Sequence, residues 1–188
     1  MEYKPLNPDA RALEEAFFAE ENRRLLQRLR EKRDREARRA AMREALPNAD
    51  DALIDQLLEL GISPETALAV VFVPLAMVAW ADGEAEPRER EAILRAAEER
   101  GMSRGTPARE VLESWLGHKP GAELIAAWKR YVRTVGSGLS DEERRGIRDR
   151  MLQMTRDVAS AEGGFLGLTK KISPAERAVI EEIEQTFR

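Results

Sequence analysis

The chain has 188 residues, of which 43% are hydrophobic and 35% are charged, and its formal net charge is −4. This apolar content is enough for one core of ordinary size, and the acidic balance gives no general attraction to nucleic acid or anionic membrane. The chain has no cysteine and a single histidine, His118. Disulfide frameworks, zinc–thiolate sites and relays of two imidazoles are therefore excluded, and carboxylates are the main candidates for binding chemistry.

Two stretches bear on location. The first residues show no basic region followed by an apolar one, so no secretory signal is predicted and we expect a cytoplasmic protein. The most apolar run, residues 67–81, is shorter than the roughly 20 residues that cross a bilayer, and it contains Pro74. It predicts a buried helix with a kink at Pro74 and no transmembrane segment.

Residues 8–46 contain no glycine and are rich in helix-forming residues, which predicts one long helix. Its larger apolar side chains lie before Arg30, in a first half that can dock on a partner, whereas the second half, with Arg33 to Arg43, is expected to be mostly solvated. Arg and Lys outnumber acids from Arg23 to Arg43. We therefore assign residues 1–47 to a long basic helix that docks on a protein partner or forms a coiled coil, and residues 48–188 to a helical domain. No specific nucleic-acid binding is expected.

The remaining chain alternates helix-starting and helix-stopping residues. Capping side chains and prolines precede each apolar segment, and glycines follow most of them. No segment alternates polar and apolar residues as a strand does, so the predicted fold is all-α. The expected helices cover residues 50–60, 63–81, 87–101, 108–116, 121–135 and 140–161, with a last one from 173 onward.

One helix corner occurs twice. Residues 78–83 (VAWADG) match residues 158–163 (VASAEG), and the PRER sequence from Pro87 matches the PAER sequence from Pro174. Residues 165–171 are most simply an insertion in the second copy. Each copy consists of a buried helix, an acid followed by glycine, a loop and a proline-initiated helix, which predicts two related helix-loop-helix hairpins in one domain.

The acids of the two corners have different expected roles. Glu89 and Glu176 occupy the third position of their helices, where a carboxylate caps free amide groups. Asp82 and Glu162 follow a helix end, where the helix dipole disfavours an acid by about 0.3–1 kcal/mol. A positive partner is therefore expected beside Asp82 and Glu162.

Two kinds of positive partner remain open. An arginine (Arg88, Arg90 or Arg177) could neutralise the acids, or a hard divalent cation such as calcium or magnesium could bind them. The stretch after Asp82 is not an EF-hand, because Pro87 and Ile93 occupy the positions of the required glycine and glutamate. The candidate metal ligands are Asp82, Glu89, Glu162 and Glu176.

These residues resemble the tellurite-resistance TerB-like family. The resemblance is carried by the sequences ADGE (81–84), Pro87 with Glu89, ASAEGG (159–164) and ISPAE (172–176), and it covers about residues 50–188. It implies a compact bundle of about seven helices with an acidic patch that binds divalent metal, in proteins of stress-response and membrane-linked complexes. Glu162 stands where aspartate is more usual in the family, and the long basic helix lies outside the family pattern.

The expected function is a non-enzymatic, cytoplasmic interaction module that binds a divalent cation. The alternative is a structural adaptor without metal that self-associates or binds a partner through the N-terminal helix, and peripheral membrane association is compatible with either. A third candidate is hydrolysis by a carboxylate-bound metal. We interpret His118 as a solvated loop residue, and the three tryptophans as core residues.

Overall fold

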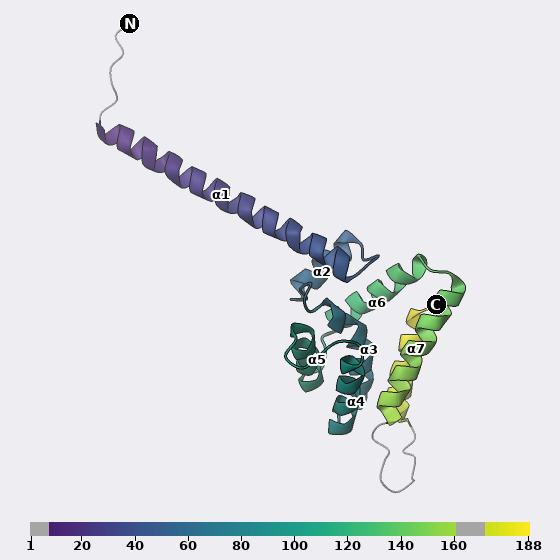
Figure 1. The fold of residues 1–188 in the computed structure, drawn as a ribbon. Helices are drawn as coiled ribbons and strands as arrows, with labels where there is room; N and C mark the ends of the chain where they lie inside the picture. The colour runs from purple at the N-terminus through teal and green to yellow at the C-terminus, as the bar shows by residue number, and fades with distance from the viewer. Residues whose placement is uncertain (1–7, 161–171) are drawn as a thin grey trace. The chain divides into compact units, whose positions relative to one another are not determined.

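The computed structural model describes residues 8–160 and 172–188, and side chains from Leu13 onward in these ranges. The described residues form helices and no strand, which confirms the all-α fold (Figure 1). The chain divides into two compact units, Met1–Ala40 and Ala41–Arg188. The elements are α1 (Pro8–Ala45), α2 (Asp51–Glu59), a 3-10 helix η1 (Ala67–Phe72), α3 (Val73–Ala79), α4 (Pro87–Glu98), α5 (Pro107–Gly117), α6 (Ala122–Ser137), α7 (Asp141–Ser160) and α8 (Pro174–Thr186).

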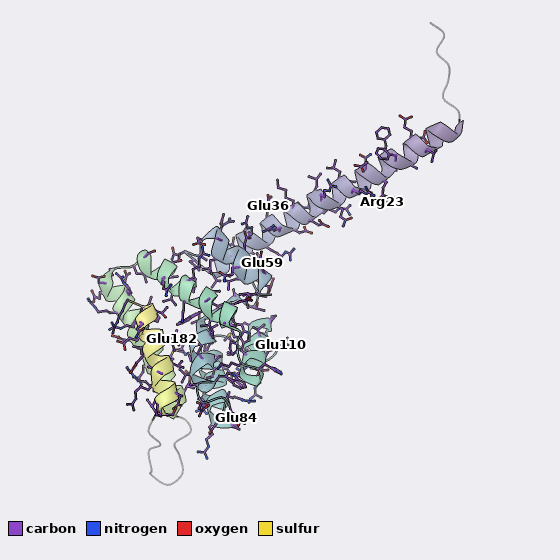
Figure 2. All side chains as sticks on the ribbon, turned by 180° about the vertical axis from the view of Figure 1, so that it is seen from behind. Arg23, Glu36, Glu59, Glu84, Glu110 and Glu182 are labelled. Atoms are coloured by element: carbon purple, nitrogen blue, oxygen red, sulfur yellow. The ribbon has the colours of Figure 1, made fainter. Side chains whose placement is uncertain are left out.

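The described part of the first unit is the stretch of α1 from Pro8 to Ala40. Its described side chains are almost all exposed, and short-range ion pairs such as Arg23 with Glu20, at 2.7 Å, lie along it (Figure 2). Such pairs each add only a few tenths of a kcal/mol to helix stability. The long helix predicted from residue 8 is confirmed.

The last turn of α1 belongs to the second unit. Met42 and Leu46 are buried in its core, and Arg43 pairs with Asp51 at 2.6 Å. Met42 and Leu46 are four residues apart, so they share one face of the helix end. The expectation that this part of the helix is mostly solvated is wrong for Met42.

Pro74 does not kink one long helix, as we expected. The chain instead forms two segments, η1 and then α3, and Pro74 lies in the first turn of α3. Proline has no amide hydrogen and its ring collides with the carbonyl four residues earlier, so it is better tolerated at a helix start than in a helix interior. Every residue of α3 is buried, which makes α3 the centre of the second unit.

The two predicted helix-loop-helix hairpins are α3–α4 and α7–α8. α3 packs against α4, α7 and α8, and α7 also packs against α4 and α8. The α3–α4 loop turns at Gly83, whose φ of +105° only glycine adopts readily. Glu84 of this loop lies at the end of the unit where α7 ends and α8 begins (Figure 2). The matching loop of the second hairpin, which includes Gly163, lies outside the described residues.

Candidate functional site

The site begins at the first turns of α4 and α8. The amide of Glu86 donates to Oε2 of Glu89 at 2.9 Å, and the amide of Ser173 donates to Oε2 of Glu176. Ser173 returns the bond, since its Oγ accepts from the Glu176 amide at 3.1 Å. Both helix starts are capping boxes, as predicted. In each box, the amide of the cap residue binds one of the two carboxylate oxygens of the glutamate.

Both capping glutamates are buried. Glu89 is 4% exposed and Glu176 is 6% exposed. Within the described ranges neither carboxylate has an ion-pair partner, although most charged side chains in this chain are exposed or paired. A buried carboxylate without a cation is costly, because it loses water without gaining a counter-charge.

The pKa of Glu89 is affected by other acids that lie near it. The pKa of its carboxyl is raised from 4.5 to about 7, and burial is the largest cause, which outweighs the hydrogen bond from the Glu86 amide. The negative charges of Glu176, Asp82 and Glu86 contribute to the same rise in pKa. The structure therefore brings Asp82, Glu89 and Glu176, which come from both hairpins, into one electrostatic neighbourhood. We call this region the acidic corner.

Asp82 is the exposed member of the acidic corner. In the part of the chain that the structure describes, Asp82 forms no ion pair with an arginine. Of the three arginines considered as its partner, Arg90 turns its Nε to the carbonyl of Ala85 instead, at 2.7 Å. Arg90 is therefore not the arginine that neutralises Asp82.

The fourth candidate, Glu162, lies outside the described residues. Among residues 8–160 and 172–188, no three histidine, aspartate or glutamate side chains are grouped so that they could hold a metal ion. Asp82, Glu89 and Glu176 thus do not form a ligand set by themselves. A cation at the acidic corner needs further oxygen ligands from Glu162, main-chain carbonyls or water, which are the ligands that calcium and magnesium accept.

The single histidine and the tryptophans are part of the helical framework of the second unit. His118 is the exposed cap residue after α5, as interpreted from the sequence. Trp128 is fully buried, and Nε1 of Trp80 donates to the carbonyl of Trp115 at 2.9 Å, which ties the end of α3 to α5.

Two further features of the second unit were not predicted from the sequence. Arg109 is buried and donates to the carbonyl of Leu94 at 2.8 Å and to the carboxylate of Glu113 at 2.8 Å, so it secures the end of α4 to α5. An apolar pocket also lies between α6, α7 and the end of α8. The apolar spacing along α6 was visible in the sequence, but neither the pocket nor its neighbours follow from it.

No protein-family model, no curated protein and no solved structure matches this chain. The resemblance to the TerB-like family therefore stays a prediction that rests on the residues quoted above. None of the helices in the described ranges combines the length and the apolar character needed to cross a membrane.

Proposed function

We propose that the second unit is a non-enzymatic helical module that binds a divalent cation, calcium or magnesium, at the acidic corner. The observation that carries this proposal is the buried carboxylate of Glu89, which has a pKa raised to about 7 and lies among the charges of Glu176, Asp82 and Glu86. A divalent cation offsets this repulsion directly, because it favours the ionised form of each carboxylate that it touches.

The chemistry of the side chains favours a hard cation. The acidic corner offers carboxylate oxygens only, and the chain has no cysteine and a single histidine, which lies after α5. Oxygen ligands suit calcium and magnesium, whereas zinc and copper sites usually include nitrogen or sulfur. Glu162, which adjoins the end of α7, is the proposed fourth ligand.

The cellular role is proposed from the family resemblance. TerB-like proteins imply an interaction module in a stress-response or membrane-linked setting, including tellurite resistance, with the protein in the cytoplasm. A protein partner or a second copy is the expected contact, and peripheral association with a membrane fits the same setting.

Titration calorimetry with calcium, magnesium, manganese and zinc tests the cation proposal. We expect the wild-type chain to bind at least one hard cation, and Asp82→Asn to weaken that binding about tenfold or more. Glu84→Gln is the matched control, because Glu84 is an exposed acid of the same loop and is not one of the proposed ligands. Absence of binding at about 1 mM cation, the weak end of calcium sites, would show that the acids are structural and do not bind a cation.

A second candidate function is a metal-free adaptor that makes contacts through α1. This candidate is supported by the large apolar side chains on α1 that are more than half exposed, which are Leu13, Phe17, Phe18, Leu25, Leu26 and Leu29. Apolar side chains gathered on one exposed element mark contact surfaces. Light scattering of the full chain and of a chain starting at Ala41 tests this candidate, and a monomer in both cases would exclude self-association through α1.

A further inference from the structure

The apolar pocket of the second unit has the size of one aromatic side chain. It is about 210 Å³ in volume and is lined by aromatic and aliphatic side chains that include Trp128, Tyr131, Val135 and Phe187. An apolar cavity of about 150 Å³ is enough to hold benzene. Aromatic walls also favour an aromatic guest through edge-to-face contacts.

Arginines surround the mouth of this pocket. Arg144 lines the pocket itself and also the two depressions beside it, which Arg133, Arg145 and Arg148 line as well. Among the described residues, Asp141 is the one acid that lines these three hollows, and it pairs with Arg144, while Arg148 pairs with Asp149. Arg133 and Arg145 are exposed, and neither forms an ion pair within the described residues. The surroundings of the apolar pocket are therefore positively charged.

One segment of the same chain has the opposite character. Residues 13–22 (LEEAFFAEEN) contain four glutamates and no Lys or Arg, although Glu20 and Glu21 also pair with Arg23 and Arg24 of the following turn. Phe17 in this segment is 62% exposed, and its ring packs only edge-on against Phe18, with centroids 5.9 Å apart. Glu14, Glu20 and Glu21 are three or four residues from Phe17, so they share its face of the helix.

We infer that Phe17 of a second copy of this chain inserts into the pocket between α6, α7 and α8, with the glutamates beside it facing the arginines at the mouth. This occupant is chosen because the two surfaces are complementary. The segment is acidic and carries an exposed aromatic ring, and the pocket is lined by aromatic side chains and has basic surroundings. The inference rests on α1 being a contact surface, which is the second candidate function above.

This contact joins two different surfaces, so it is heterologous. Each copy offers one Phe17 segment and one pocket, and such contacts build rings or open chains of molecules. A coiled coil of α1 with α1 is different, because it joins identical surfaces and depends on Leu25 and Leu29. The two arrangements therefore respond differently to the same substitutions.

Sedimentation velocity of full-length variants up to about 100 µM tests the inference. The first variant, Phe17→Ala, retains the pocket but lacks the inserting ring. The second, Arg133→Glu with Arg145→Glu, retains the ring but reverses two exposed charges at the mouth and removes no ion pair among the described residues. We expect each variant alone to self-associate about tenfold or more weakly than wild type, and high salt to weaken wild-type association.

The mixture of the two variants gives the decisive result. In the mixture, the Phe17→Ala chain has an intact pocket with its arginines, and the arginine variant has an intact Phe17 with its glutamates. A one-to-one complex of the two variants is therefore expected only if these two surfaces bind each other. Leu29→Ala and Arg150→Glu, which change exposed residues of α1 and α7 outside these surfaces, serve as controls and should associate as wild type does.

Three outcomes overturn the inference. If the arginine variant associates as wild type does while Leu29→Ala does not, α1 is a contact surface but the pocket is not its receptor. If the two variants do not combine when mixed, the surfaces do not meet. If wild type stays a monomer throughout, this inference fails together with self-association through α1.

Discussion

At the scale of single residues, Glu89 links the fold to the proposed function. Its carboxyl has a pKa of about 7 in the folded chain against 4.5 ordinarily. Between these two values the folded chain holds a proton that the unfolded chain releases. The contribution of Glu89 to stability is therefore lost as pH rises from about 4.5 to 7, and this loss persists at higher pH.

We predict that Glu89→Gln stabilises the protein at pH 8 by about 1–2 kcal/mol and flattens the change in stability between pH 5 and pH 8. Glutamine retains an oxygen that accepts from the Glu86 amide, so the cap is kept while the buried charge is removed. Urea denaturation at both pH values, with a chelator present to exclude cations, measures this effect.

Glu91→Gln is the matched control for this prediction. Glu91 is an exposed acid on the same helix whose pair with Arg95 spans 3.4 Å, and exposed pairs of this kind contribute little. Its substitution should leave the pH dependence unchanged. If Glu89→Gln kept the wild-type loss of stability between pH 5 and pH 8, the buried charge of Glu89 would not be the cause.

At the scale of elements, the α3–α4 corner depends on the backbone of Gly83. A Cβ added at Gly83 would meet no atom within 4 Å, so the cost of a side chain there comes from its φ of +105° alone. We predict that Gly83→Ala destabilises the chain by about 1 kcal/mol.

Gly117→Ala provides the comparison, because a Cβ there also meets open space but the backbone lies outside the left-handed region. It should change the free energy of unfolding by less than about 0.5 kcal/mol. Equal effects of the two substitutions, measured by thermal or urea unfolding, would contradict the role of backbone conformation at this corner.

The helix starts were predictable because they depend on neighbouring residues only. Asp50 accepts from the Leu53 amide at 2.8 Å, and Ser173 with Glu176 forms the predicted box. The break before α3 was not predicted. Every side chain around it is apolar, so the pattern contains no periodicity, and Pro74 is compatible both with a kink and with a helix start.

At the scale of the whole molecule, the boundary between helix and domain is set by Met42 and Leu46. Both lie before the predicted domain start at residue 48, yet both are buried in the core of the second unit. We predict that a chain starting at Ala41 keeps the stability of the second unit, whereas a chain starting at Asp51 loses about 3 kcal/mol or more. Circular dichroism during urea denaturation measures both.

The stabilities of the two truncated chains are compared with each other. The chain from Asp51 lacks two buried side chains and also the cap residue Asp50, whose carboxylate accepts from Arg130 of α6. Equal stability of the two chains would mean that the end of α1 does not belong to the core. A large loss already in the chain from Ala41 would mean that the first unit stabilises the second.

The acidic corner was predictable in part. The repeated helix corner identified Asp82, Glu89 and Glu176 as candidate ligands, because a repeat can be recognised from the order of residues alone. Their approach in space follows from the packing of α3 against α4 and α8, which no local pattern contains. The burial of Glu89 and Glu176, and the arginines around the pocket of α6 to α8, also depend on contacts between segments far apart in the chain.

Cation binding at the acidic corner can be seen directly in a crystal of the full chain grown with manganese, a probe for magnesium and calcium sites, by an anomalous difference map. We expect a peak at the acidic corner, within about 2.0–2.6 Å of oxygen atoms from Asp82 and from Glu89 or Glu176. The peak should be absent in crystals of Asp82→Asn. A map with no peak at this corner in the wild-type protein would contradict the account.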